Sequence, residues 1–285
     1  MIGRMAANRI VPLVDHERLG GPYWLLTFRH REIAREAQAG QFVMIKAGTS
    51  AEPPLRRPFS IMLTDAGAET FTLFIKDVGS GSGALCALEP GEPVQCLGPL
   101  GQAFTPPPAG TEALLVAGGY GVAPFRLFAE EVKHTGGRYR LFYGGRTSDD
   151  LPLRERLETA GLPLVLATED GSVGHRGRVT VPLAEWLDRR DAPARLYACG
   201  PEPMLHAVAR LAEERDLVAE VSLDPWMGCG IGTCLGCVVR VQDANEARGR
   251  YRCACTEGPV FDAARVQWPD EKASRARRKA AGAEA

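Results

Sequence analysis

The chain has 285 residues, 24% of them charged, and a formal net charge of −1 at pH 7. This length allows two or three domains, and the balanced charge argues against a broad nucleic-acid interface. No run of about 18 apolar residues occurs, so no membrane span is expected. The start, Met1 to Asn8, lacks an apolar core of signal-peptide length. We therefore expect a cytoplasmic protein whose eight cysteines are metal ligands and buried thiols.

The pattern of residues 8–105 predicts a β-rich domain. Short apolar or alternating runs with turn residues between them predict strands, and several at this spacing predict a small antiparallel barrel. The expected strands are Tyr23–His30, Gln41–Lys46, Phe59–Leu63, Phe71–Val78 and Val94–Leu97, with one short helical turn at Ala84–Leu88.

Two stretches of this domain carry chemistry. In Arg57-Pro58-Phe59-Ser60 the arginine can pair with a pyrophosphate, the proline stiffens the strand entrance and the serine can hydrogen-bond a ring edge. Gly79-Ser80-Gly81-Ser82 begins a short helix, whose backbone amides can bind an anion. Either stretch alone is more often purely structural.

Together with Gly98-Pro99-Leu100-Gly101, these stretches resemble the FAD-binding module of ferredoxin–NADP⁺ reductase-type flavoproteins. The resemblance implies that Arg57, Pro58, Phe59 and Ser60 bind the flavin and its phosphate. It places Phe74, Ile75 and Lys76 beside the ring and ribityl chain. Gly81 and Ser82 would hold the pyrophosphate, with Ser82 keeping the hydroxyl of the threonine that is commoner in the family.

From Ala113 onward strands alternate with helices, which predicts a doubly wound parallel sheet over residues 106–217, covered on both faces. Ligands in that architecture bind at the carboxyl ends of the strands, where the glycine clusters of this chain fall. The expected strands are Leu114–Ala117, Tyr139–Tyr143, Pro163–Ala167 and Arg195–Ala198, and the expected helices are Val122–Thr135, Leu153–Ala160, Val181–Arg189 and Pro203–Arg215.

The turn after the first of these strands reads Gly118-Gly119-Tyr120-Gly121-Val122-Ala123-Pro124. Proline replaces the third glycine of the Rossmann pattern, so nucleotide binding and a tight strand–helix turn are equally consistent with it. The run resembles the pyridine-nucleotide domain of the same reductase family, and Cys199-Gly200-Pro201 resembles that family's second motif. The resemblance implies an NAD site at Gly118, Gly119, Gly121, Pro124, Cys199, Gly200 and Pro201. Cys199 would lie near the nicotinamide and flavin as a candidate catalytic residue, its alternative being a buried small hydrophobe.

Arg146 follows the second strand of this sheet, where the adenosine ribose is usually recognised. There it can hold a 2′-phosphate and favour NADP, stack on adenine, or cap Asp149 and Asp150. The acidic loop Thr168–Ser172 lies after the third strand and is expected close to the nucleotide without chemistry of its own.

Cys229, Cys234 and Cys237 stand in C-x4-C-x2-C spacing, with further cysteines at 253 and 255. This is the plant-type [2Fe–2S] ligand pattern, and the glycines in the loop let amide groups approach the sulfurs. A structural zinc site usually shows two C-x2-C pairs, and disulfides need an oxidising compartment. Spacing does not choose between Cys253 and Cys255; in one strand they would face opposite sides, so only one would ligate.

The order of the three modules resembles the electron-transfer subunit of class 1B dihydroorotate dehydrogenase over residues 8–268. The most specific pieces are Met227–Cys237 and Cys255-Thr256-Glu257-Gly258-Pro259-Val260-Phe261. In that family the last cluster cysteine precedes an acidic-Gly-Pro-Val-Phe run. The resemblance thus implies Cys229, Cys234, Cys237 and Cys255 as ligands in a cluster domain at 218–268, with Cys253 spare. Residues 269–285 are expected to be a loose helix or disordered tail.

The resemblance also implies a function: electrons pass from the FMN of a partner subunit through the cluster and FAD to NAD⁺, in de novo pyrimidine biosynthesis. FAD is the necessary converter, because nicotinamide takes a hydride and the cluster takes one electron at a time. The partner would be the dihydroorotate dehydrogenase catalytic subunit, in a heterotetramer with two of each subunit. The segment Asp224–Met227 either presents an apolar surface to it or packs within the small domain.

Two other functions compete with this one. The small subunit of an NADH-dependent ferredoxin:NADP⁺ oxidoreductase, or a sulfide dehydrogenase relative, has the same module order. That type has a contracted cluster loop with a carboxylate in place of one cysteine, so the full set of cysteines disfavours it. A non-enzymatic ferredoxin-like carrier or redox sensor is disfavoured by the two intact nucleotide motifs.

Overall fold

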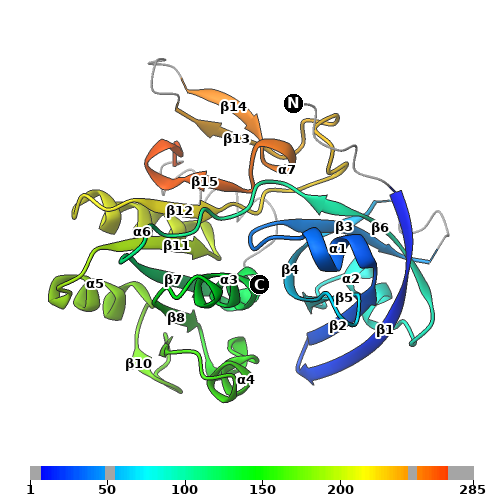
Figure 1. Cartoon of the computed structure of the whole chain (residues 1–285), viewed down its shortest axis with the longest axis horizontal. Helices are drawn as coiled ribbons and strands as arrows, with labels where there is room; N and C mark the ends of the chain where they lie inside the picture. Colours follow the sequence, from blue (N-terminus) through cyan, green and yellow to red (C-terminus); the bar gives the residue numbers. More distant parts are fainter. Residues whose placement is uncertain (1–7, 49–54, 243–248, 269–285) are drawn as a thin grey trace.

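The computed structural model describes residues 8–48, 55–242 and 249–268. Its first part is a closed antiparallel barrel, drawn in blue to cyan in Figure 1, with strand order β1-β2-β5-β4-β3-β6. The barrel elements are β1 (Asn8–Gly20), β2 (Tyr23–Arg29), α1 (Arg31–Glu36), β3 (Phe42–Ala47), β4 (Arg57–Asp65), β5 (Thr70–Lys76), α2 (Ser80–Cys86) and β6 (Pro93–Leu100). The predicted antiparallel barrel is confirmed. The predicted tail at 269–285 lies outside the described residues.

Two barrel elements were not individually predicted, and one begins earlier than expected. β1 alternates only loosely between buried and exposed positions, because it pairs with both β2 and β6 at the barrel's closure. α1 is a six-residue helix in which the His30 side chain accepts a hydrogen bond from the Ile33 amide. The helical turn expected from Ala84 begins at Ser80, because the Ser82 side chain accepts hydrogen bonds from the amides that precede the helix.

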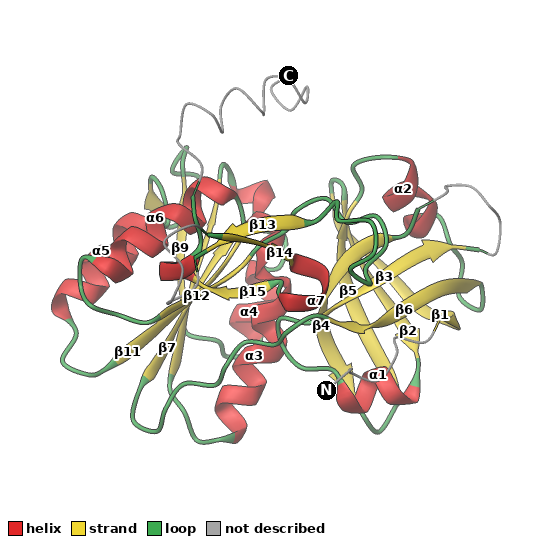
Figure 2. Cartoon of the chain, turned by 90° about the horizontal axis from the view of Figure 1, so that it is seen from above, coloured by secondary structure: helices red, strands yellow, loops and turns green. Residues whose placement is uncertain are grey.

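The second part is a seven-stranded sheet with order β10-β9-β8-β7-β11-β12-β15, in which only the edge strand β15 runs antiparallel. Helices cover it as the alternation predicted, and Figure 2 shows this sheet beside the barrel. The elements are β7 (Glu112–Gly118), η1 (Gly119–Val122), α3 (Ala123–His134), β8 (Tyr139–Gly145), η2 (Ser148–Asp150), α4 (Arg154–Thr159), β9 (Leu164–Thr168), β10 (His175–Arg176), α5 (Thr180–Arg189), β11 (Ala194–Cys199), α6 (Glu202–Glu213) and β12 (Ala219–Ser222).

The C-terminal part does not stand alone. Of the residues expected to form the cluster domain, β12 and β15 (Val260–Asp262) complete the sheet of the nucleotide domain. The rest form a hairpin of β13 (Val238–Val241) and β14 (Arg250–Cys253), followed by α7 (Ala254–Glu257) and η3 (Ala263–Arg265). No helix among the described residues has the length and hydropathy to cross a membrane.

Phe104 joins the barrel to the sheet domain. It follows the last barrel strand, and its ring lies 5.6 Å from Phe125, 5.3 Å from Phe128 and 5.7 Å from Tyr197, centroid to centroid. Its amide donates to the Ala39 carbonyl, so the segment is held on the barrel side as well. The ring is buried, and the two domains therefore share one aromatic core.

Replacing Phe104 by alanine should lower the free energy of unfolding by about 3–5 kcal/mol, because the change leaves a cavity in this shared core. Urea denaturation followed by circular dichroism measures the loss. Val181→Ala, on the exposed side of α5, is the control and should change stability by no more than about 0.5 kcal/mol. A loss below about 1 kcal/mol for Phe104→Ala would show that the domains do not depend on this contact.

Candidate functional site

Arg57 lies over the start of α2. A Cβ placed on Gly81 would meet Arg57 Nε at 2.8 Å, so glycine leaves the space that the arginine occupies here. The guanidinium also donates from Nη1 to the Leu55 carbonyl at 2.8 Å. A cation and helix N-terminal amides thus share one edge of the barrel, which is the donor set that a pyrophosphate requires. The residues present fit the phosphate part of FAD.

The Ser82 hydroxyl shapes this edge from within. Its Oγ accepts hydrogen bonds from the amides of Val78 at 2.9 Å and Gly79 at 3.1 Å. It can donate to Asp77 or to the Gly79 carbonyl. The hydroxyl is buried and engaged inside its own loop, so it holds the loop in shape. Direct contact with a pyrophosphate stays a prediction.

The remaining predicted flavin residues lie on two neighbouring strands. Pro58, Phe59 and Ser60 are half-buried on β4, and β4 pairs with β3 and β5. Phe74 and Ile75 are buried on β5, where Phe74 stacks on Tyr23 at 5.7 Å between ring centroids. Lys76, which ends β5, is the more accessible member of that trio. The structure therefore brings the predicted residues to adjoining strands at one side of the barrel.

The two glycine-rich loops of the sheet domain touch one another. A Cβ on Gly121 would lie 2.3 Å from the Cys199 carbonyl oxygen, and one on Gly118 would lie 2.5 Å from Pro201 Cδ. Pro124 is buried in the first turn of α3. The loops meet because β7 and β11 are adjacent parallel strands whose carboxyl ends share an edge. The residues expected to bind NAD are thus brought together, with Arg146 further along the same edge.

Ser222, Asp224 and Tyr120, to which the sequence assigned no role at this site, lie around Cys199. Its thiol hydrogen-bonds the Ser222 side chain, and burial followed by the charge of Asp224 raises its pKa to about 12. Asp224 hydrogen-bonds Tyr120. Desolvation, followed by the charge of Asp224, raises the pKa of Tyr120 to about 12, although this residue is 52% exposed to solvent. Cys199 is therefore a neutral thiol, unsuited to act as a thiolate nucleophile.

Backbone amides of the cysteine loop point at its sulfurs. The amides of Ile231 and Cys234 each donate to Cys229 Sγ at 3.5 Å, and the Gly236 amide donates to Cys234 Sγ at 3.5 Å. Burial alone would raise the pKa of Cys229, but the amides of Cys234 and Ile231 lower it to about 6. Glycine permits this loop, since Gly230 and Gly232 have φ of 76° and 77°. A loop that stabilises thiolates fits an anionic cluster.

No three His, Cys, Asp or Glu side chains among the described residues are grouped for a single metal ion. The thiolates of a two-iron cluster are divided between two irons, so the donor set decides the fit. Cys229, Cys234 and Cys237 come from the loop itself, and Cys237 hydrogen-bonds Cys255 across the site. Four thiols, with backbone amides directed at Cys229, Cys234 and Cys255, therefore supply the donor set that a [2Fe–2S] cluster requires.

Cys253 and Cys255 do not lie in one strand, which corrects the geometry assumed from their spacing. β14 ends at Cys253, and Cys255 lies in the short helix α7. Both hydrogen-bond Cys237, but only Cys255 is fully buried, and it accepts from the Gly232 amide at 3.2 Å. The chain turn between the two residues replaces the strand alternation that was expected.

The cysteine loop packs on the barrel. A Cβ on Gly230 would meet Met44 Cγ at 2.5 Å, and one on Gly101 would meet Pro259 Cδ at 2.5 Å. The Gln102 amide donates to the Gly258 carbonyl at 2.6 Å. Met44 lies opposite Pro58 in the β3–β4 ladder. The loop therefore reaches the strand next to the one that carries Arg57 to Ser60.

The dinucleotide turn is linked to the neighbouring strand β4 through the helix that follows it. Helix α3, which follows the Gly118–Pro124 turn, packs against β4. Glu131 on this helix accepts a hydrogen bond from the Ala39 amide at 2.9 Å. β4 consequently adjoins the strand under the cysteine loop and contacts the helix after the nucleotide turn.

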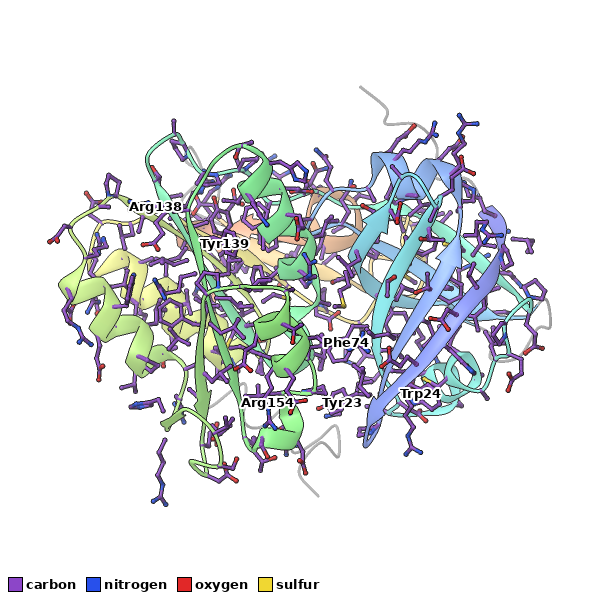
Figure 3. All side chains as sticks on the ribbon, turned by 60° about the horizontal axis from the view of Figure 1, so that its bottom comes forward. Tyr23, Trp24, Phe74, Arg138, Tyr139 and Arg154 are labelled. Carbon is purple, nitrogen blue, oxygen red and sulfur yellow. The ribbon has the colours of Figure 1, made fainter. Side chains whose placement is uncertain are left out.

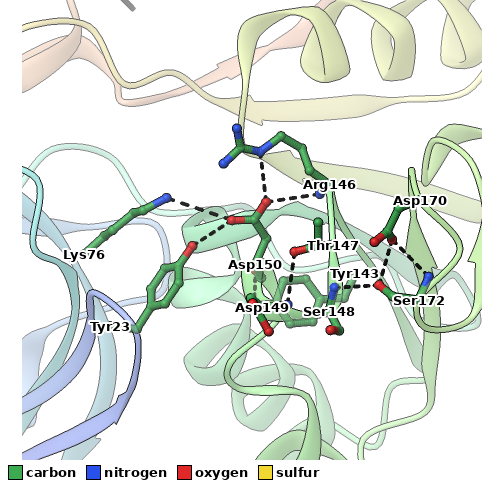
Figure 4. Close-up of polar contacts among 10 residues, drawn as sticks. All are labelled: Tyr23, Lys76, Tyr143, Arg146, Thr147, Ser148, Asp149, Asp150, Asp170 and Ser172. Atoms are coloured by element: carbon green, nitrogen blue, oxygen red, sulfur yellow. Dashed lines mark hydrogen bonds and ion pairs between the residues drawn. The ribbon is translucent and has the colours of Figure 1, made fainter. Parts of the chain in front are cut away.

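Arg146 is held by Asp150, the capping alternative that the sequence had left open (Figure 4). Its Nε donates to Asp150 Oδ2 at 3.0 Å, and its backbone amide donates to the same oxygen at 3.2 Å. The other carboxylate oxygen accepts from Tyr23 of the barrel at 3.0 Å. Tyr23 had no signal in the sequence, because its partner lies 127 residues away.

Two family models match the chain. The iron–sulfur cluster binding domain of dihydroorotate dehydrogenase B matches residues 224–267, and the oxidoreductase NAD-binding domain matches residues 115–210. These spans contain the cysteine loop and the two nucleotide loops described above.

Several similar proteins carry the description dihydroorotate dehydrogenase B (NAD(+)), electron transfer subunit. One from Bacillus caldolyticus is 37% identical over 272 residues, covering 93% of this chain and 99% of the relative. Others are from Geobacillus sp. (38% over 264 residues, 92% and 99% covered) and Desulforamulus reducens (34% over 245 residues, 86% and 92% covered).

Among solved structures, the NADH-dependent reduced ferredoxin-NADP oxidoreductase is 27% identical, with a TM-score of 0.79 over 99% of both chains. A ferredoxin NADP⁺ reductase from Neisseria gonorrhoeae with bound FAD and NADP shares the fold, at 17% identity and a TM-score of 0.62 over 73% of this chain and 91% of that one. At the identities and coverage of its relatives, the chain belongs to the electron transfer subunits of dihydroorotate dehydrogenase B, a family of NAD-dependent flavin and iron–sulfur oxidoreductase subunits.

Proposed function

We propose that this chain links the FMN of a dihydroorotate dehydrogenase catalytic subunit to NAD⁺ in pyrimidine biosynthesis, with a [2Fe–2S] cluster and FAD of its own. The observation that carries the proposal is the position of β4, which adjoins the strand under the cysteine loop and contacts the helix after the nucleotide turn. When bound, FAD exchanges a hydride with nicotinamide and single electrons with the cluster.

The barrel residues 8–105 bind the flavin in this proposal. Arg57, with the first amides of α2, holds the pyrophosphate charge, and Gly81 leaves the space that Arg57 occupies. Pro58, Phe59 and Ser60 line the flavin from β4, while Phe74, Ile75 and Lys76 support it from β5. Ser82 acts through the loop that its hydroxyl holds.

Residues 106–217, with β12 and β15 completing the sheet, bind NAD. Gly118, Gly119 and Gly121 bring the backbone close to the nucleotide, and Pro124 begins the helix that follows. Gly200 and Pro201 complete the edge next to Gly118. Cys199 lies there as a neutral thiol, so its role is to position the nicotinamide and exclude water.

The cluster ligands proposed within 218–268 are Cys229, Cys234, Cys237 and Cys255. Cys255 is preferred to Cys253 because it is buried and its sulfur accepts a backbone amide. The Cys253 amide instead donates to the Glu257 carboxylate at 2.9 Å, so the backbone of Cys253 helps to hold the chain turn between β14 and α7.

The partner's surface is expected at the exposed side of the cysteine loop. Trp226 is 88% exposed, and Ile231, Leu235 and Tyr251 are exposed as well. Exposed apolar side chains of this number are typical of a protein interface. Because Cys234 is also exposed here, electrons would enter at this face from the catalytic subunit. We propose a cytoplasmic heterotetramer with two copies of each subunit.

One alternative retains support, namely the electron-bifurcating subunit suggested by the full-length likeness to the NADH-dependent reduced ferredoxin-NADP oxidoreductase. The four cysteines and the identities of 34–38% to the dihydroorotate dehydrogenase relatives favour the main proposal. Reconstitution with a catalytic subunit, described below, separates the two.

Purified anaerobically, the chain should contain about two irons and two labile sulfides, and Cys255→Ser should lose both. Cys253→Ser is the matched control and should keep them, because only the Cys255 sulfur is buried against the Gly232 amide. Chemical iron and sulfide determination with visible absorbance gives the answer. Loss of the cluster in Cys253→Ser alone would assign the fourth ligand to the other cysteine.

Adding a class 1B catalytic subunit should create NAD⁺-dependent oxidation of dihydroorotate that neither chain shows alone. Trp226→Asp should weaken this coupling at least tenfold, because it places a charge in the apolar face, while NADH still reduces the bound FAD. Orotate formation and flavin absorbance measure the two activities. A dihydroorotate:NAD⁺ rate that does not depend on this chain would refute the partnership.

A further inference from the structure

A cavity of about 740 Å³ opens between the barrel and the sheet domain, on the side where β8 ends. On one side lies the β1–β2 turn with Tyr23, and on the other lies the segment from Arg146 to Glu155. Tyr23 and Arg154 lie across this boundary from each other in Figure 3. Because the cavity adjoins the carboxyl end of the strand after the dinucleotide turn, it lies where an adenosine ribose is recognised in such folds.

One carboxylate engages two of the cations at this cavity. Asp150 Oδ2 accepts from Arg146 Nε at 3.0 Å, while Oδ1 lies 4.0 Å from Lys76 Nζ and accepts from Tyr23 at 3.0 Å. Burial opposes ionisation of Asp150, but the hydrogen bonds from Arg146 and Tyr23 hold its pKa below the ordinary range. The carboxylate is therefore charged at neutral pH.

The charges that line the cavity balance. Arg146, Lys76 and Arg154 are the cations, and Asp149, Asp150 and Glu155 are the anions. Arg154 is itself paired, with Nη2 at 3.3 Å from Glu155 Oε1. Glu169, after the next strand, adds a further negative charge that acts on Arg146. A 2′-phosphate carries close to two negative charges, so it would meet no surplus of positive charge here.

We propose that Asp150, by holding Arg146, is the residue that makes this chain prefer NAD(H) to NADP(H). An arginine recognises a phosphate best with its fork free for two parallel hydrogen bonds, and Asp150 occupies the Nε position of that fork. A ribose 2′-hydroxyl carries no charge and is compatible with the balanced cavity. The inference rests on the proposed NAD site and adds the residue that sets its specificity.

Asp150→Asn is the informative substitution. Asparagine still offers Tyr23 an acceptor, but it removes the charge and turns the Arg146 contact into a weaker one. We expect the affinity for NADP⁺ relative to NAD⁺ to rise roughly tenfold, equivalent to about 1.4 kcal/mol. Isothermal titration calorimetry of each nucleotide with the FAD-loaded full chain measures this ratio without relying on turnover.

Asp188→Asn is the matched control. Asp188 makes a similar pair with Arg215, whose Nε and Nη2 lie 3.0 and 2.8 Å from Asp188 Oδ1, but it lies on α5, outside the cavity. The Asp188→Asn substitution removes the same charge, and its ratio of NADP⁺ to NAD⁺ affinity should match that of the wild type. Adding Arg146→Ala to Asp150→Asn should abolish the gain in NADP⁺ affinity, because the released arginine is what binds the phosphate.

An unchanged ratio of NADP⁺ to NAD⁺ affinity in Asp150→Asn would overturn the inference. A weaker affinity for NADP⁺ would also overturn it, because it would mean that Asp150 orients Arg146 toward the phosphate. If thermal melting shows Asp150→Asn to be unfolded, Asp150→Ser removes the same charge and must give the same gain. Bleaching of the bound FAD by NADH is recorded in every variant. Failure of the wild type to bind NAD⁺ or be bleached would refute the proposed function, whereas an intact NADH reaction with an unchanged ratio refutes only the role of Asp150.

Discussion

Close packing against the central barrel strands is the constraint on which the rest of this structure depends. β3 receives the cysteine loop through Met44, and β4 receives helix α3 of the sheet domain. These two contacts bring the cysteine loop and the helix after the dinucleotide turn to two neighbouring strands of the barrel. Because the interior is close-packed, a change of side-chain volume at either contact must be accommodated by the neighbouring residues.

Glycines at these contacts are needed because a side chain would overlap a neighbouring group. Only some of them also have backbone angles that favour glycine. Gly121 admits the Cys199 carbonyl, and Gly230 admits Met44, in places where any Cβ would overlap a neighbour. Gly230 also has a positive φ, which adds a second reason for its identity. The absence of a side chain thus lets the two glycine-rich loops of the sheet domain meet, and it lets the cysteine loop pack on the barrel.

Electrostatics divides the molecule into two kinds of site. Around Cys199, desolvation raises the pKa values of the Cys199 thiol and the Tyr120 hydroxyl to about 12, so both groups are neutral at pH 7. At the cysteine loop and at Asp150, hydrogen-bond donors outweigh burial and favour the anion. Hydrogen-bond donors therefore set the charge state at the cysteine loop and at Asp150, whereas desolvation sets it around Cys199.

Local patterns in the sequence determined the barrel, the parallel sheet and the spacing of Cys229, Cys234 and Cys237, because turn residues, alternation and short-range ligand spacing are properties of neighbouring residues. The family resemblance supplied the flavin, the nucleotide and the fourth cysteine, and comparison with known proteins confirmed the family and its cofactors. Tertiary structure alone placed Cys255 in a helix rather than a strand, and paired Tyr23 and Arg146 through Asp150. It also decided that β12 and β15 join the nucleotide sheet. Such contacts join residues that chain folding brings together from distant positions, and no local pattern encodes them.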